Sequence, residues 1–369
     1  MKMYTQTNLI AQQNRLDYVD MTKSIGMFAI IWGHIMLSGW SNNLVYSFHI
    51  PLFFFLSGMM FNGTKYPSVW LFVKRRVKTL LVPYVMFSFV TWALWAGMNV
   101  LTHSKTNIWK PLLQTFIAQG SGGFMVHNVP LWFVTCLFVV ELLYYFINKL
   151  PNWLNIVICI ICALIGDYMI RGGYLSFFRL LPWNIEGAMS ALLFYSLGNL
   201  LIKKLTHQKL VELIKDHRAV VIPLIVILTV FLYFSANWNG HITLGSNSLG
   251  RNTLVFYGNA FVGIFTTISF SVLLTLIKVN NSIGNKIMEF LKWFGQNSFM
   301  VMASHVPVKW IIIIAIAKVF GTTAIGVSEN MKYSAIAFIL TIIVDSLVVY
   351  LLSLLKKHDE ALVNRKKNR

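Results

Sequence analysis

Charged side chains are scarce in this sequence of 369 residues, since only 12% are Asp, Glu, Lys or Arg while 57% are hydrophobic. Soluble globular domains carry about 25% charged residues. The shortage argues against a soluble domain and indicates a polytopic membrane protein. Acidic residues are the rarest: 12 Asp and Glu stand against 31 Lys and Arg, which gives a formal net charge of +19.

Cysteine is scarce as well. The three cysteines, Cys136, Cys159 and Cys162, lie in apolar stretches, so neither a disulfide framework nor a metal site is predicted. No Gly/Ser-rich linker and no soluble segment of domain size interrupts the chain. We therefore expect a cytoplasmic segment at 1–22, one transmembrane domain at 23–355 and a basic cytoplasmic tail at 356–369.

Long apolar stretches predict about ten transmembrane helices, and so an all-α polytopic helix bundle. Residues 24–64 contain no Asp, Glu, Lys or Arg, a length that fits two helices joined by a polar turn at 41–43. Further spans are predicted near 79–101, 130–148, 153–170, 183–202, 219–235, 253–277, 294–316 and 333–355. The last two contain Lys309 and Asp345, respectively.

The distribution of Lys and Arg predicts the orientation. With the N-terminus inside, 23 of the 31 basic residues fall in inward-facing segments, as expected for cytoplasmic loops. Both termini are therefore predicted to be cytoplasmic. The expected location is the cell membrane, which in bacteria is the plasma membrane. This bias and attraction to anionic membrane lipids account for the net charge, so no nucleic-acid partner is needed.

Ionisable side chains within the predicted spans are candidates for function, because an unpaired one costs several kcal/mol in a bilayer. They are His34, His49, Glu141, Glu186, His305 and Asp345.

Two of the histidines belong to the first predicted hairpin. Lys23 and His34 are eleven residues apart, which places them on nearly one helix face about 16 Å apart. His34 and His49 lie at similar distances from the predicted turn, so we expect them at comparable depth. A neutral histidine can accept and return a proton near pH 7. The other reading of His34, His49 and His305 is a hydrogen bond to a neighbouring helix.

Four cations, Lys74, Arg75, Arg76 and Lys78, precede the third predicted span. They are either a topology signal or a site for phosphate groups, which Arg binds by bidentate contacts. No glycine-rich phosphate loop is present, so nucleotide hydrolysis is not supported. Glu141 could orient a histidine, pair with a cation or bond another helix. Glu186 could bind a sugar hydroxyl or be an interfacial charge.

Several blocks resemble the acyltransferase-3 superfamily of integral membrane acyltransferases, particularly its sugar O-acetylases. FHIPLFFFLSG at 48–58 is similar to the second-helix motif of that family, and Lys23 with His34 resembles its basic residue followed by histidine. Further similar blocks follow in order: Arg75 to Lys78 with LLVPY at 80–84, LWF at 131–133, and Gly295, Asn297, Ser298 and His305. Lys23 and Lys78 stand where Arg is commoner, so the fork geometry of Arg is lost.

The resemblance implies transfer of an acyl group, usually acetyl, from cytoplasmic acetyl-CoA to a hydroxyl of a cell-surface glycan or its lipid-linked precursor, without a metal. It implies four residues for the CoA phosphates: Lys23, Arg75, Arg76 and Lys78. His34 would meet the thioester, as a general base or as a nucleophile. His49 would deprotonate or orient the acceptor.

The remaining predicted site residues are His305 and Glu141, as catalytic groups, and Glu186 and Trp132, as acceptor-binding groups. The size of the acyl pocket cannot be read from the sequence, so acetyl and succinyl both stay open, and so does the oligomeric state. The alternative function is a transporter or glycan exporter that uses the buried histidines as a proton relay. No pair of broken helices in matching halves supports that alternative.

Overall fold

The computed structural model describes residues 16–37, 39–103, 105–120, 124–171, 181–246, 248–277 and 281–367. Within these ranges the chain is helical, and the sole β-bridge is an isolated one between Thr243 and Ser248. The prediction of an all-α fold is confirmed. Some predicted features lie outside the described residues: most of the N-terminal segment (1–15), Lys278, residues 121–123 and the last two residues of the tail.

Eight helical segments of the described chain are long and apolar enough to cross a membrane. They are Val69–Leu101, Val129–Ile147, Asn152–Met169, Pro182–Lys204, Arg218–Asn239, Thr253–Leu276, Ser298–Val319 and Met331–Leu355. All eight coincide with predicted spans, and the helices that carry Lys309 and Asp345 are continuous: α15 (Ser298–Val319) and α17 (Met331–Lys367). The protein is therefore a multi-pass membrane protein.

The first hairpin differs from the prediction. Helix α2 (Asp17–Ile35) is followed by a break and by α3 (Trp40–Tyr46), so residues 41–43 are helical and the predicted turn there is wrong. The chain turns instead around Gly39, whose φ of +93° is open to glycine but disfavoured for other residues. Helix α4 (His49–Met59) has 11 residues and extends only about 16 Å, roughly half the thickness of a bilayer core.

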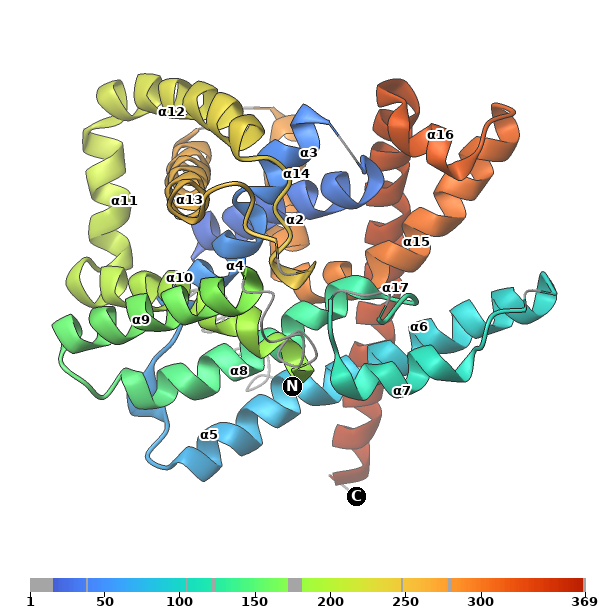
Figure 1. Cartoon of the computed structure of the whole chain (residues 1–369), viewed down its shortest axis with the longest axis horizontal. Coiled ribbons are helices and arrows are strands. Elements are labelled where there is room, and N and C mark those ends of the chain that lie inside the picture. Colours follow the sequence, from blue (N-terminus) through green and yellow to red (C-terminus); the bar gives the residue numbers. More distant parts are fainter. Residues whose placement is uncertain are drawn as a thin grey trace.

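Helices α4, α8 (Trp132–Ile147), α9 (Asn152–Arg171) and α10 (Ile185–Lys204) form one packed group (Figure 1). Glycine allows α4 and α10 to touch through their backbones. A Cβ atom on Gly58 would overlap the carbonyl oxygen of Tyr195, and one on Gly198 would overlap that of Phe55. These two positions hold α4, and with it His49, against α10.

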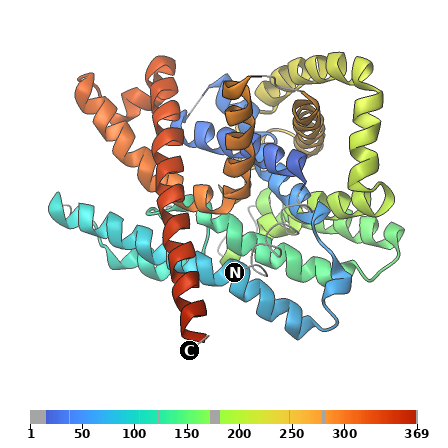
Figure 2. The same cartoon turned by 180° about the vertical axis from the view of Figure 1, so that it is seen from behind.

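A second group surrounds α2. Helices α13 (Thr253–Leu276), α14 (Ser282–Gln296), α15 and α17 pack against α2, and α12 (Arg218–Asn239) covers α13. Figure 2 shows α17 crossing the molecule along its full height. Gly295 of α14 lies so close to α2 that a Cβ would overlap the Asp20 carbonyl. The short helices α11 (His207–Asp216) and α16 (Ala324–Glu329) link these spans.

Helices α5 (Val69–Arg76) and α6 (Val82–Leu101) form one span through a π turn at Val77–Leu81. The turn ends two residues before Pro83, which has no N–H to donate to the preceding turn. Single π turns of this kind occur inside α-helices. Helix α6 and α7 (Trp109–Ile117) project together from the bundle, and we call this pair the arm (Figure 1).

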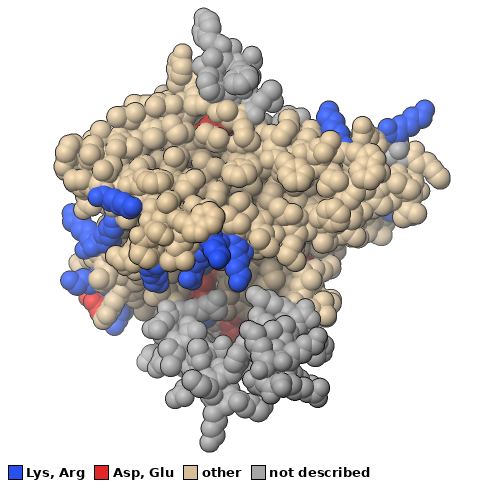
Figure 3. Space-filling view, turned by 90° about the horizontal axis from the view of Figure 1, so that it is seen from below, with Lys and Arg blue, Asp and Glu red and all other residues tan. Residues whose placement is uncertain are grey.

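Charge is unevenly distributed over the surface. Figure 3 shows a broad face of uncharged side chains, with Lys and Arg gathered along one edge and a few more at the far end of the molecule. An uncharged belt with basic residues at its edge is the surface expected of a membrane protein.

Candidate active site

Two cavities meet at His34. The first, of about 190 Å³, lies between α2, α4, α8 and α15. Lys23 and His34 both line it, as their spacing predicts, and the rest of its wall is mainly apolar. Ser57 and Ser298 contribute hydroxyl groups to it. The second cavity, of about 70 Å³, is also lined by His34, together with His49, Tyr46 and residues 242–245.

Three residues line both cavities: His34, Ile50 and Trp132. Trp132 is only 7% exposed and begins helix α8. A group held in the first cavity and a group held in the second would therefore both lie next to His34. The predicted site residues His34, Lys23, His49 and Trp132 are brought together by this arrangement.

His34 lies at the last turn of α2, where helix carbonyl groups have no partner within the helix. Side chains from elsewhere bond them. Asn42 donates through Nδ2 to the Gly33 carbonyl at 3.1 Å, and Lys309 donates through Nζ to the His34 carbonyl at 2.7 Å. Both bonds hold the backbone on which the His34 ring is mounted.

His49 is the first residue of α4 and is 2% exposed. Its Nδ1 lies 2.6 Å from the Val45 carbonyl oxygen. A carbonyl can only accept, so Nδ1 carries the proton and Nε2 presents a lone pair in the neutral ring. Tyr46 stands between the histidines, with ring centroids 4.8 Å from His49 and 6.5 Å from His34. We therefore regard Nε2 as the basic atom of His49.

His305 repeats this pattern. It is fully buried, Nδ1 lies 3.1 Å from the Val301 carbonyl oxygen, and Nε2 has no hydrogen-bond partner. The centroid of its ring lies 5.3 Å from that of His34. The bonds of His49 and His305 each return to the preceding turn of chain. The alternative reading, a bond to a neighbouring helix, fits His49, whose partner Val45 lies in α3, and does not fit His305, whose partner Val301 lies in the same helix α15.

Glu141 lies outside this histidine cluster. Its Oε2 forms an ion pair with Arg76 Nε at 2.8 Å, and Tyr195 Oη donates to its Oε1 at 3.5 Å. Of its three predicted possibilities, the structure has two: the pair with a cation and a hydrogen bond to another helix, since Tyr195 belongs to α10. Arg76 is thereby paired with a buried carboxylate. Its Cζ atom also lies 5.9 Å from the ring centroid of Tyr66 and 5.5 Å from that of Phe72.

The other predicted cofactor-binding cations occupy two places. Lys23 lines the first cavity and lies 3.7 Å from the Asp20 carboxylate. Arg75 and Lys78 are exposed on α5 and on the π turn, and neither lines the cavity.

Glu186 is buried and lines neither cavity. Gln119 donates through Nε2 to its Oε1 at 3.3 Å, and the next residue, Gly120, lines the second cavity. Asn184 accepts the Gly120 N–H at 3.0 Å. Glu186 therefore supports the wall of the second cavity from behind and does not face it.

Sequence reasoning missed three residues that contribute to this geometry: Tyr46, Asn42 and Lys309. A lysine within a predicted span was a sufficient signal for Lys309, since such residues are functional candidates by default. Asn42 was missed because the turn was expected at 41–43, and nothing in the sequence pointed to Tyr46. Among the described residues, no group of three or more His, Cys, Asp or Glu side chains is placed to hold a metal ion.

The comparisons with known proteins agree with this picture. A family model described as an acyltransferase domain matches residues 16–353. The matched region contains every helix that lines the two cavities. No curated protein and no solved structure matches the chain.

Proposed function

The chain belongs to the acyltransferase family whose model matches residues 16–353, and on that premise we propose that it is an O-acetyltransferase of the bacterial plasma membrane. In this proposal acetyl-CoA from the cytoplasm is the donor and a hydroxyl of a cell-surface glycan or its lipid-linked precursor is the acceptor. The observation that carries it is the meeting of two cavities at His34. Transfer between two substrates needs one basic group within reach of both.

The first cavity is suited to the donor. Lys23 lies at its wall, and a cation there would attract a phosphate of CoA. The apolar wall would accept the uncharged pantetheine arm, and its small volume suits a short acyl group. Arg75 and Lys78, which are exposed on α5 and on the π turn, would bind further phosphates at the surface.

The second cavity is suited to the acceptor hydroxyl. His34 or His49 would take the hydroxyl proton, the oxygen would attack the thioester carbonyl, and the C–S bond would break. The CoA thiolate would leave and take up that proton. In the covalent variant His34 attacks the thioester carbonyl first, the C–S bond breaks and the CoA thiolate leaves. His49 then takes the hydroxyl proton, the acceptor oxygen attacks the acyl group and the bond to His34 breaks. In both routes the proton lost by the acceptor is balanced by the one that the thiolate takes up.

Acetyl transfer by purified protein tests the proposal. We would incubate full-length protein in detergent with radiolabelled acetyl-CoA and measure CoA thiol release with and without glycan. His34→Gln should abolish release, whereas His103→Gln, on an exposed residue of the 102–120 segment, should retain it. Acid quench would trap label on the wild-type protein only if the covalent route operates.

Cells distinguish acyl transfer from export. Mass spectra of surface glycans should lose one acetyl increment both in a deletion strain and in one restored with His34→Gln. A fall in the amount of glycan with unchanged acetylation would instead favour the exporter and contradict the proposal.

A further inference from the structure

A third cavity, which we call the lateral cleft, lies between the arm and α15. It has a volume of about 420 Å³, roughly twice that of the first cavity. Figures 1 and 2 both show α6 and α15 diverging from the base of the arm. Both helices belong to segments that are long and apolar enough to cross a membrane. A cleft between two such helices is placed to face lipid.

Its lining is mainly apolar and uncharged. Leu94 and Met98 come from α6, and Trp310, Ile311 and Ile314 come from α15. These side chains are between 43% and 61% exposed. Such a surface is complementary to a hydrocarbon chain, because it offers dispersion contacts without any charge that would have to be desolvated.

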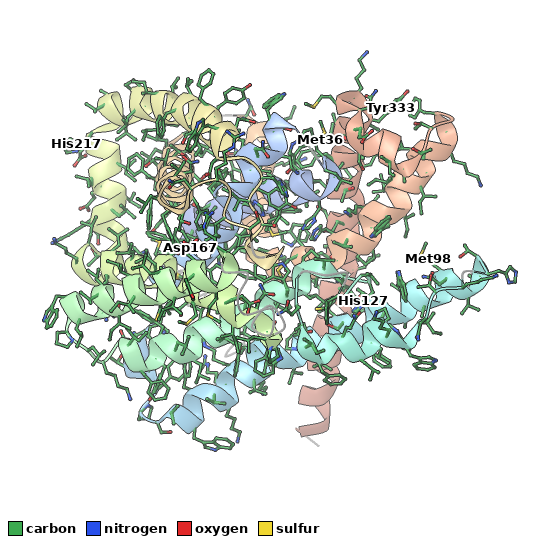
Figure 4. All side chains as sticks on the ribbon, viewed as in Figure 1. Met36, Met98, His127, Asp167, His217 and Tyr333 are labelled. Atoms are coloured by element: carbon green, nitrogen blue, oxygen red, sulfur yellow. The ribbon has the colours of Figure 1, made fainter. Side chains whose placement is uncertain are left out.

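His127 gives the cleft a polar inner end. The residue is 3% exposed, lines the cleft, and has no hydrogen-bond partner on Nδ1 or Nε2. Figure 4 places it where the arm joins the bundle, with Met98 farther out along α6. A buried imidazole with two free nitrogens is costly. A ligand that could both donate to and accept from this ring would remove that cost.

The position of His127 is built into the fold. Pro307 lines the cleft and lacks the N–H that would bond the Ala303 carbonyl within α15. Asn128 donates to that carbonyl through Nδ2 at 2.7 Å. The proline thus creates an acceptor that anchors the chain next to His127 on α15.

The same segment separates the cleft from the other cavities. His127 lines the lateral cleft, Val129 the second cavity and Pro130 the first. One short piece of chain is therefore shared by all three. A head group bonded to His127 would lie beside the chain segment that also lines the second cavity, which receives the acceptor hydroxyl in the proposed function. This connection distinguishes the lateral cleft from an ordinary groove for bulk phospholipid.

We propose that the lateral cleft binds the hydrocarbon chain of a lipid-linked sugar, with His127 hydrogen-bonding the polar group where chain and sugar join. This inference rests on the proposed function and makes it more specific: the acceptor is presented from the bilayer on a lipid carrier. A long, uncharged chain fits the cleft, and the attached sugar would extend from His127 towards the second cavity.

Photolabelling tests the inference without requiring turnover. The probe is a polyprenyl phosphate that carries one sugar and a diazirine in its chain, added to full-length protein in vesicles of phosphatidylethanolamine and phosphatidylglycerol. Labelled peptides should map to α6 and α15. An excess of the same lipid-linked sugar without the diazirine should reduce this labelling. Equal competition by phosphatidylglycerol would overturn the inference, and so would labelling elsewhere in the protein.

Two matched tryptophan variants localise the chain. Leu94 and Val90 lie on the same helix and are 56% and 55% exposed, but only Leu94 lines the cleft. Leu94→Trp should reduce labelling about tenfold, the change expected when two methylene groups lose their burial. Val90→Trp should label like wild type. Equal labelling of both variants would place the chain elsewhere and overturn the inference.

His127→Ala and His127→Gln test the polar end, since glutamine restores both a donor and an acceptor. Alanine should lower probe affinity, and glutamine should recover part of the loss. Equal affinity in wild type and both variants would remove His127 from the site.

Kinetics separate this inference from the function on which it rests. The ratio of KM for a lipid-linked acceptor to KM for a water-soluble sugar should rise about tenfold in Leu94→Trp. Turnover without labelling of the cleft would overturn the inference alone. Specific labelling without acyl transfer to any acceptor would leave the lipid site standing and overturn the proposed function.

Discussion

Lys309 donates a hydrogen bond of 2.7 Å from Nζ to the backbone carbonyl of His34. Lys309 is 9% exposed, and one turn earlier on α15 His305 lies beside the ring of His34. A lysine inside a membrane span is costly, so its retention needs a reason other than stability. The bond offers one: it fixes the end of α2 just where the imidazole must meet two substrates.

The first prediction follows from this bond. Lys309→Met keeps the length of the side chain and removes the ammonium, so the backbone of His34 loses its anchor. We expect kcat to fall by about 10- to 100-fold, the range associated with displacements of about 1 Å at a reacting group. KM for acetyl-CoA should change little, because Lys309 lines neither cavity.

A stability measurement distinguishes positioning from a structural role. Replacing a buried ammonium by an apolar group should leave the melting temperature unchanged or raise it. Lys309→Arg should recover part of the lost kcat, and Lys318→Met, on an exposed residue of the same helix, should behave as wild type. Wild-type kcat in Lys309→Met would show that the bond does not position His34.

The pair of Arg76 and Glu141 leads to a second prediction. Glu141→Gln leaves a partly buried guanidinium without its carboxylate, and breaking a buried pair in this way costs about 3–5 kcal/mol. We expect the lower end of that range, because the Arg76 side chain is 21% exposed. Glu141→Leu combined with Arg76→Met should restore most of that stability, as measured by thermal melting in detergent. Arg75→Met, on an exposed cation, is the control.

Activity of the double variant tests the catalytic role first predicted for Glu141. Because the carboxylate lies on Arg76 and not on a histidine, we expect a stable double variant to retain transfer. A stable but inactive double variant would show that the pair of Arg76 and Glu141 is needed for transfer.

The close approach of α4 and α10 gives a third prediction. Gly58→Ala would push a methyl group into the Tyr195 carbonyl, and overpacking of this kind typically costs about 1–3 kcal/mol. Gly97→Ala on α6 is a matched control, because nothing lies within 4 Å of the added atom. Thermal melting should separate the two variants, and equal melting temperatures would show that α4 can shift without cost.

Hydropathy predicted the spans well because the bilayer imposes a length and a composition that each segment must meet alone. It failed at the first hairpin, where the apolar run from 24 to 64 is divided into α2, α3 and α4. Run length cannot tell a spanning helix from a short one that is covered by other helices. Here packing of α4 on α10, through Gly58 and Gly198, replaces contact with lipid.

The site was predictable in part for a similar reason. An ionisable residue in an apolar run is visible in the sequence, so His34, His49 and His305 could be found. Which of them meet depends on interhelical contacts that the sequence does not encode locally. Glu141 has the same local appearance as the histidines, yet its partner, Arg76, lies 65 positions earlier and directs it to another part of the bundle.

The fourth prediction concerns pH and His127, which lies in the loop before α8. Burial lowers the pKa of its imidazole from 6.5 to about 4, and the side chains that line the cleft with it are uncharged. The folded pKa lies below the unfolded one, so between these values the unfolded chain binds more protons. The contribution of His127 to the free energy of unfolding is therefore fully present above about pH 6.5 and is lost as the pH falls towards 4.

With these two pKa values, proton linkage lowers the free energy of unfolding by about 2 kcal/mol at pH 5. His127→Gln cannot titrate, so its melting temperature should fall less than that of wild type between pH 7.5 and pH 5. His103→Gln, which changes an exposed histidine of the preceding segment, should follow wild type. Parallel curves for wild type and His127→Gln would mean that His127 reaches water in the folded protein, and the polar end of the lateral cleft would then be open to solvent.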